Sequence, residues 1–301
     1  MTDSSPTPFD DVVIAGGTHG NERTGVALVQ HWQKNPAEIQ GKTFATRTLL
    51  SNPEAIRRNI RFVDCDLNRS FLPHHLGDPA ANAYEIKRAR EISAWMTAGQ
   101  DGRRTFAIDL HTSTACMGTT LITNSEPVNL AIALAVQRDL EGARVYSFAD
   151  SNRINSCLRA AAPGGLGIEI GPIPQGVLRH DILDMTRAAV ARVLATVERF
   201  NRGELASPDL QRTLYRHDRH MAFPETAPEG PPAFIHRDLE GRDYRPLHPG
   251  QPIFEDLAGR LWHYEGPEVR YPVFINEAAY YYENIAFSLT RKITLASLDI
   301  F

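Results

Sequence analysis

Short apolar runs alternate with helical repeats through the first two thirds of the chain. Val12 to Ala15 is a continuous apolar run ended by glycines, which is typical of a buried strand. Apolar residues then recur at helical spacing from Val26 to Trp32, so we expect a helix that begins near Glu22. Further strands are expected at residues 42–50, 105–111, 119–123, 143–148 and 166–171, and further helices at 86–96, 127–140 and 182–200. Such alternation predicts a mainly parallel α/β sheet with helices on both faces.

The pattern changes after residue 200. A polar segment with Gly and Pro, typical of a linker, leads to a region without strong helical periodicity. This region contains short β-like runs at residues 234–236, 252–254, 260–264, 271–275 and 285–295, and Ala258-Gly259 predicts a hairpin turn between two of them. We therefore expect an α/β domain over residues 1–208 and a smaller β-rich domain over residues 209–301.

Composition and charge narrow the class of protein. The 301 residues are 42% hydrophobic and 23% charged, as in an ordinary soluble globular protein. A formal net charge of -4 gives no electrostatic argument for binding nucleic acid or an anionic membrane. The N-terminal residues contain no apolar signal-peptide core, and no run has the length of a membrane span. Three widely spaced cysteines indicate reduced thiols, so we expect a cytoplasmic protein.

Three side chains that can bind a metal fall at or beyond the ends of predicted strands. His19 and Glu22 lie in the glycine-rich corner after the first strand, and His111 ends a later strand. Functional groups of open α/β sheets gather at the carboxyl ends of the strands, so these distant residues are expected together. A His-Glu-His set leaves one coordination position open, as hydrolytic zinc sites do. By itself, His-x-x-Glu also fits an ordinary turn whose side chains face solvent.

Two further carboxylates accompany this set. Asp109 lies two residues before His111, on the same side of the strand, and we expect it to accept a hydrogen bond from a ligand histidine, His19 in particular. Glu169 lies in an apolar Gly-Ile-Glu-Ile-Gly run and is the candidate general base for an attacking water molecule. The structural alternatives are a solvent-facing strand cap for Asp109 and a buried Glu169 paired to an arginine.

Three arginines and an asparagine indicate an anionic substrate. Arg61 is a candidate for polarising a carbonyl group. Asn68 and Arg69 are suited to hold a carboxylate, since the arginine fork binds it through two hydrogen bonds. Arg159 is a second candidate for the same task. Taken singly, each arginine is more often a surface residue.

Longer motifs resemble one known family. They are Gly-Gly-Thr-His-Gly-Asn-Glu-Arg-Thr-Gly from Gly16, Asp-Cys-Asp-Leu-Asn-Arg from Asp64, Asp-Leu-His from Asp109, Gly-Ile-Glu-Ile-Gly-Pro-Ile-Pro-Gln-Gly-Val-Leu-Arg from Gly167 and Asn-Glu-Ala-Ala-Tyr-Tyr from Asn276. From about Val12 to Leu295 they closely resemble the aspartoacylase and aminoacylase-3 family. This resemblance implies a zinc carboxypeptidase-like α/β core with a mixed central sheet and a β-rich C-terminal domain that covers the active-site cleft.

The resemblance also implies roles at the matching positions. One zinc ion per chain would be bound by His19, Glu22 and His111, with Glu169 as the general base. Arg61 would polarise the carbonyl group of the substrate.

Other matching positions would bind the substrate. Asn68 and Arg69 would hold its α-carboxylate, and Arg159 would hold a side-chain carboxylate. Tyr280 would reach in from the C-terminal domain, although Tyr280 to Tyr282 reads locally as a strand. Gln175 and Glu277 are expected to support the cleft.

The implied reaction is hydrolysis of the amide of an N-acyl amino acid, with N-acetyl-L-aspartate as the favoured substrate. Asn155 stands where aspartoacylases tend to have a tyrosine that helps hold the side-chain carboxylate. An aminoacylase for aromatic or mercapturic N-acyl amino acids and a succinylglutamate-type desuccinylase therefore stay open. So does a non-catalytic zinc-binding module, which would not need Glu169. The family resemblance implies a homodimer or higher homo-oligomer.

Overall fold

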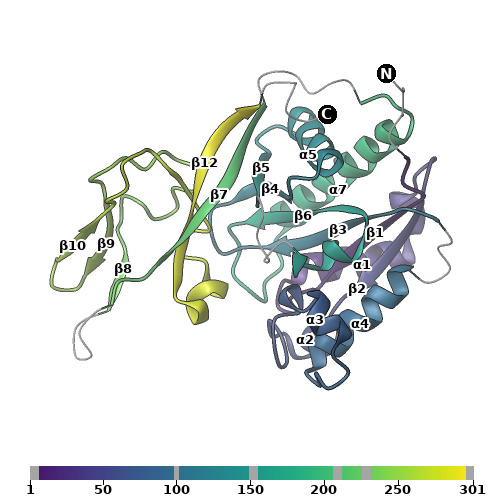
Figure 1. The fold of residues 1–301 in the computed structure, drawn as a ribbon, viewed down its shortest axis with the longest axis horizontal. Coiled ribbons are helices and arrows are strands. Elements are labelled where there is room, and N and C mark those ends of the chain that lie inside the picture. Colours follow the sequence, from purple (N-terminus) through teal and green to yellow (C-terminus); the bar gives the residue numbers. More distant parts are fainter. Residues whose placement is uncertain (1–6, 98–101, 149–154, 206–211, 226–231, 296–301) are drawn as a thin grey trace.

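A computed structural model gives the fold (Figure 1) and describes residues 7–97, 102–148, 155–205, 212–225 and 232–295. The strands of its large sheet are β1 (Asp11–Gly16), β2 (Ala45–Leu50), β3 (Thr105–Thr112), β4 (Gly118–Thr123), β5 (Arg144–Ser147), β6 (Gly164–Gly171), β7 (Arg212–Ala222), β11 (Tyr271–Val273) and β12 (Ile285–Leu295). Their nine-stranded order is β11-β12-β7-β5-β4-β6-β3-β1-β2. Strands β2, β1, β3 and β6 are parallel, whereas β4 runs antiparallel to β6. The expected mixed, mainly parallel sheet is confirmed.

A three-stranded antiparallel sheet lies beside the large one (Figure 1). It contains β8 (Ala233–Ile235), β9 (Pro252–Asp256) and β10 (Leu261–His263). Strands β9 and β10 form the hairpin expected at Ala258-Gly259. The expected β-rich C-terminal part is therefore present.

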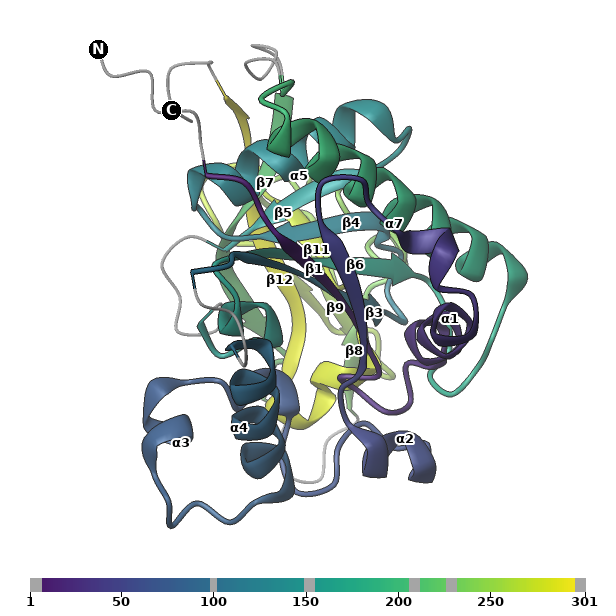
Figure 2. The same ribbon diagram turned by 90° about the vertical axis from the view of Figure 1, so that its right-hand side faces the viewer.

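The side chains of β1 alternate between two buried clusters, which explains why helices cover both faces of the sheet. Val12 and Ile14 pack with α1 (Arg23–Lys34), α5 (Pro127–Asp139) and α7 (His180–Asn201). Val13 and Ala15 pack on the other face, chiefly against α4 (Tyr84–Thr97). Figure 2 shows these two groups of helices on opposite sides of β1 and β3.

Four elements differ from the sequence expectation. Strand β7 was not expected, because charged residues interrupt its apolar positions; its 11 residues pair with β5 and β12 and bring the C-terminal segment into the large sheet. The strand expected at Tyr280 to Tyr282 is wrong, because these residues form the 3-10 helix η4 (Ala278–Glu283). Two short helices, α2 (Pro53–Arg58) and α3 (Pro73–Gly77), lie in segments for which the sequence predicted no helix.

The carboxyl ends of β1, β3 and β6 meet at one edge of the sheet, where the candidate site lies. Two further 3-10 helices, η2 (Leu67–Arg69) and η3 (Leu158–Ala161), and η4 from the C-terminal segment also reach this edge. The expected boundary between residues 208 and 209 falls outside the described residues. None of the described helices is long and apolar enough to cross a membrane.

Candidate active site

The corner between β1 and α1 has a backbone that glycine permits. Gly17 adopts a φ of 73°, and a Cβ atom at Gly20 would lie 2.1 Å from the carbonyl carbon of Ala55. The Glu22 N–H donates to the carbonyl oxygen of His19 at 3.1 Å, which closes the turn. Glu22 is the N-cap residue of α1, yet its side chain makes no capping hydrogen bond. It points toward the site instead of stabilising its own helix.

Three candidate ligands converge in this corner. Nδ1 of His19 lies 2.5 Å from Oε1 of Glu22, and Nδ1 of His111 lies 3.0 Å from Oε2 of the same carboxylate. All three side chains are buried, and their ligand atoms lie within 4.8 Å of one another. The structure therefore brings together His19, Glu22 and His111, although His19 lies in the loop after β1 and His111 lies on β3.

A carboxylate holds the far nitrogen of each imidazole. Nε2 of His19 lies 3.1 Å from Oδ1 of Asp66, and Nε2 of His111 lies 2.8 Å from Oδ2 of Asp109. The hydroxyl of Thr18 fixes Asp109 by donating to its other oxygen at 2.7 Å. The expectation that Asp109 contacts His19 is wrong, because the side chain of Asp109 shares a face of β3 with His111.

Sequence reasoning missed Asp66. This residue is the N-cap of η2, where Oδ1 accepts the N–H of Asn68 at 2.8 Å. Its other oxygen accepts a hydrogen bond from Nη2 of Arg61 at 3.1 Å. The available signal was an acidic residue two positions before Asn68, but its contact with His19 joins segments 47 residues apart.

The charges of this cluster are strongly coupled. Although burial opposes the shift, the neighbouring His19 and His111 hold the pKa of Glu22 well below its usual range. At His111 burial would lower the pKa, but the carboxylates of Asp109 and Glu22 outweigh it and raise the pKa well above its usual range. The buried carboxylates therefore favour a positive charge between them.

This donor set fits a divalent zinc ion. Two histidines and one glutamate are a known hydrolytic ligand set, and a carboxylate behind each imidazole is the usual support for a metal-bound histidine. With Asp66 and Asp109 accepting N–H groups from Nε2, the Nδ1 atoms of both rings remain directed at Glu22. Among the described residues, this is the one group of metal-ligand side chains with such a spacing.

Glu169 lies on β6 directly beside this group. Its Cα atom is in register with that of His111 on β3. The side chain lines the same cavity and is only 8% exposed, and no described residue donates a hydrogen bond to its carboxylate. Burial raises the pKa of Glu169 well above its usual range, and the charges of Glu22 and Glu277 act in the same direction. An arginine partner, the structural alternative, is absent from the described part of the chain.

The cavity has a volume of about 70 Å³ and is lined by both acidic and basic groups. All of the catalytic, metal-binding and substrate-binding residues predicted from the sequence line it, whereas Asp109 lies behind His111. These lining residues are His19, Glu22, Arg61, Asn68, Arg69, His111, Arg159, Glu169 and Tyr280.

Hydrogen bonds fix the basic side of the cavity. Arg61 donates to Asp66 and lies 3.4 Å from Oε1 of Glu22, so it borders the metal ligands. Oδ1 of Asn68 accepts the N–H of Leu158 at 2.9 Å and thereby joins η2 to η3, the helix that carries Arg159. Nη1 of Arg69 donates to the carbonyl oxygen of Asn68 at 2.8 Å.

The C-terminal segment completes the wall through η4. Tyr280 packs against Phe274 with ring centroids 5.4 Å apart, and both residues line the cavity. Glu277 caps η4 and accepts hydrogen bonds from Ser113 and from the N–H of Thr114, in the loop that follows His111. Glu277 therefore links η4, the helix that carries Tyr280, to the loop after β3.

Comparison with known proteins shows which family has this architecture. The model of the succinylglutamate desuccinylase/aspartoacylase catalytic domain matches residues 8–197, and that of the AstE/AspA barrel-sandwich hybrid domain matches residues 211–292. The chain belongs to the succinylglutamate desuccinylase/aspartoacylase family. The resemblance found in the sequence is thus confirmed.

Relatives within the desuccinylase/aspartoacylase family have two kinds of name. The human N-acyl-aromatic-L-amino acid amidohydrolase (carboxylate-forming) is 40% identical over 95% of this chain and 92% of its own length. A probable aspartoacylase of Acaryochloris marina (strain MBIC 11017) is 38% identical over 93% and 95%. The crystal structure of murine aminoacylase 3 matches with a TM-score of 0.88 and 37% identity, over 97% of this chain and 99% of that one.

One position of this family member departs from the expected site. Asn155 does not line the main cavity; it lines a neighbouring pocket of about 210 Å³. Arg159 lines both spaces and separates them. The lining of the main cavity also includes the apolar side chains of Ile122 and Phe148.

Proposed function

We propose that this chain is a zinc-dependent amidohydrolase of N-acyl amino acids, with N-acetyl-L-aspartate as its favoured substrate and acetate and L-aspartate as products. Membership of the family supports hydrolysis of an N-acyl amino acid. The choice of an acidic substrate rests on Arg159.

The observation that carries this choice is a buried arginine whose guanidinium has no polar partner among the described residues. Arg159 is 8% exposed and lines the cavity, yet no described residue forms an ion pair or hydrogen bond with its guanidinium. A buried charge without a partner is costly, so a carboxylate supplied by the substrate would stabilise it. Arg69 and Asn68 line the same cavity and would hold the α-carboxylate, so that two clamps would select a dicarboxylic substrate.

The remaining groups have roles that follow from their positions. His19, Glu22 and His111 would hold a zinc ion, which when bound would supply Lewis-acid polarisation and a lowered pKa for a water molecule. Glu169 accepts a proton from the attacking water and later donates it to the leaving amine, a task suited to a carboxyl group with a raised pKa. Arg61 donates hydrogen bonds to the carbonyl oxygen, where negative charge develops.

A second candidate is an aromatic N-acyl amino acid. Ile122, Phe148 and Phe274 give the cavity apolar surface that a dicarboxylate would not use. The human relative is named for aromatic substrates, and Asn155 does not supply a hydroxyl group in the main cavity.

Steady-state hydrolysis of N-acetyl-aspartate and N-acetyl-tyrosine by the zinc-loaded enzyme separates these candidates. In Arg159→Ala we expect kcat/KM for the aspartate substrate to fall roughly 10- to 200-fold, the equivalent of about 1.5–3 kcal/mol for a charged hydrogen-bonded contact. Hydrolysis of the tyrosine substrate should change little. Arg199→Ala, which removes an ion pair with Asp139 on the surface, is the matched control.

A preference for the tyrosine substrate that is indifferent to Arg159 would exclude the dicarboxylate proposal. Hydrolysis of neither substrate would direct the test to N-succinyl-glutamate. Zinc binding without turnover of any of the three would favour a non-catalytic zinc-binding module.

A further inference from the structure

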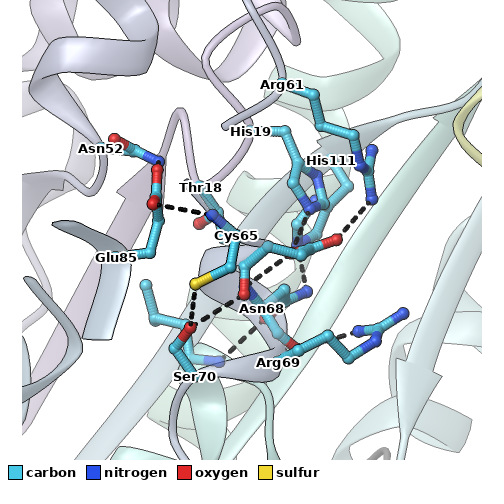
Figure 3. A network of polar contacts seen from close by, with 12 residues as sticks. Thr18, His19, Asn52, Arg61, Cys65, Asn68, Arg69, Ser70, Glu85 and His111 are labelled. Atoms are coloured by element: carbon cyan, nitrogen blue, oxygen red, sulfur yellow. Dashed lines mark hydrogen bonds and ion pairs between the residues drawn. The ribbon is translucent and has the colours of Figure 1, made fainter. Parts of the chain in front are cut away.

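Glu85 is a buried carboxylate of α4 that has no part in the mechanism above. Its side chain is 0% exposed. Oε1 accepts hydrogen bonds from Nδ2 of Asn52 at 3.1 Å and from the N–H of Val63 at 2.6 Å. Oε2 accepts the N–H groups of Asp64 at 3.0 Å and Cys65 at 3.1 Å. Figure 3 shows this carboxylate directed at the backbone of the segment that leads into the site.

Among the described residues, only Glu85 accepts hydrogen bonds from the N–H groups of residues 63–65. Residues 62–65 are themselves half-buried or exposed, so core packing does little to fix this part of the chain. Asp64 adds a second link, since its side chain accepts the N–H of Tyr84 at 2.7 Å. The first turn of α4 is therefore joined to residues 63–65 by hydrogen bonds from both sides of the contact.

The same segment presents most of the basic and amide groups of the site. Arg61 precedes Val63 by two residues, while Asn68 and Arg69 follow Cys65 within four. All three line the cavity. Asp66, in the same stretch, holds His19 at 3.1 Å. A shift of the backbone at residues 63–65 would displace all four side chains together.

We propose that Glu85 is a positioning residue of this enzyme, whose carboxylate fixes the 61–69 segment in the geometry that binds and polarises the substrate. Its kinetic consequence rests on the proposed function, whereas its effect on the backbone does not. The charge and both oxygens are required. In Glu85→Gln an NH2 group, which can only donate, replaces one of the two oxygens. At least one backbone N–H group of residues 63–65 would then face another donor in place of an acceptor.

Hydrogen exchange and kinetics together test this role. In the wild type, the N–H groups of residues 63–65 should exchange slowly despite their place in a half-exposed loop. In Glu85→Gln they should lose protection, and kcat/KM for N-acetyl-aspartate should fall about 10- to 100-fold, as expected when catalytic groups shift by about 1 Å. Glu85→Asp, which restores the carboxylate on a shorter side chain, should recover part of both.

Asp11→Asn provides the matched control. Asp11 is also a buried carboxylate, 3% exposed and paired with Arg47, but it lies at the amino end of β1, away from the site. This variant should show comparable loss of thermal stability, unchanged exchange at residues 63–65 and unchanged KM.

Each outcome decides the proposal. Kinetics of Glu85→Gln that match those of Asp11→Asn would overturn it, even if exchange at residues 63–65 increases. If Glu85→Gln does not fold, fast exchange of these amides in the wild type overturns the proposal, and slow exchange that Glu85→Asp accelerates supports it. Absence of wild-type hydrolysis would refute the proposed function, whereas the exchange data would still test the grip of Glu85 on this segment.

Discussion

The two ends of the cavity differ in how their charges are paired. At the metal end, the Glu22 carboxylate contacts both ligand histidines and Arg61, and it accepts the N–H of Thr112 at 3.0 Å. At the substrate end, Arg159 is equally buried but has no polar partner among the described residues. The first end is already a network of paired charges, whereas in the described part of the chain the second presents a buried cation that the carboxylate of the proposed substrate would pair. Substitutions at the two ends should therefore change different measured quantities.

Glu169→Gln should produce the largest change in turnover. We expect kcat to fall by a factor of about 10² to 10⁴, the usual contribution of a general base, because the amide cannot accept the proton of the attacking water. The zinc content, measured by atomic emission, should stay at the wild-type level, since Glu169 belongs to neither charged end. A variant that retains wild-type kcat would remove Glu169 from the mechanism.

Asp243 should make the stability depend on pH, because its carboxyl group is buried in the folded state. It accepts N–H groups from Cys116, after β3, and from Ile275, before η4. Burial raises its pKa to about 7 from an ordinary value of 3.8. Between these values the folded state binds more protons than the unfolded state, so this group lowers the free energy of unfolding as pH rises, by up to about 4 kcal/mol.

Urea unfolding at pH 4, 5.5 and 8 measures this effect. Relative to Asp243→Asn, the wild type should lose stability as pH rises through this window. Parallel pH profiles of the two proteins would show that Asp243 does not retain its proton in the folded state.

Asp66→Asn should weaken the metal end of the cavity. We expect zinc affinity to fall about 10- to 100-fold, because His19 loses the carboxylate that orients its ring. Competition with a chromophoric chelator measures the affinity, and Asp109→Asn should give a similar loss through His111. In contrast, Arg159→Ala should bind zinc as the wild type does. If it loses zinc, the two ends are not independent.

Tyr282→Phe should give the smallest effect. The Tyr282 hydroxyl donates to Asp66 over a long distance of 3.5 Å, and 57% of the residue is exposed. Removing so weak a contact should reduce zinc affinity by no more than about threefold, or about 0.7 kcal/mol. A loss as large as that of Asp66→Asn would show that the C-terminal segment controls the metal end.

Much of the architecture was readable because it depends on local patterns. The alternation of apolar strands and helices predicted the order of the strands and of the longer helices through α7, and the strand ends placed His19, His111 and Glu169 at one edge of the sheet. Periodicity failed where the local signal conflicted with the final environment. Charged residues concealed β7, and three aromatic residues resembled a strand although Glu277 starts a 3-10 helix there.

The sequence by itself determined the chemistry available to this protein: a histidine and a glutamate in a glycine-rich corner, a second histidine at the end of a later strand, a carboxylate in an apolar strand and basic residues in specific motifs. Only the tertiary structure decided how these groups are paired. It paired Asp66 with His19, placed the Glu85 carboxylate against the backbone of residues 63–65 and left the Arg159 guanidinium without a polar partner among the described residues. These relations join residues far apart in the chain, and they arise from the register of the parallel strands and the packing of α4, which no local spacing encodes.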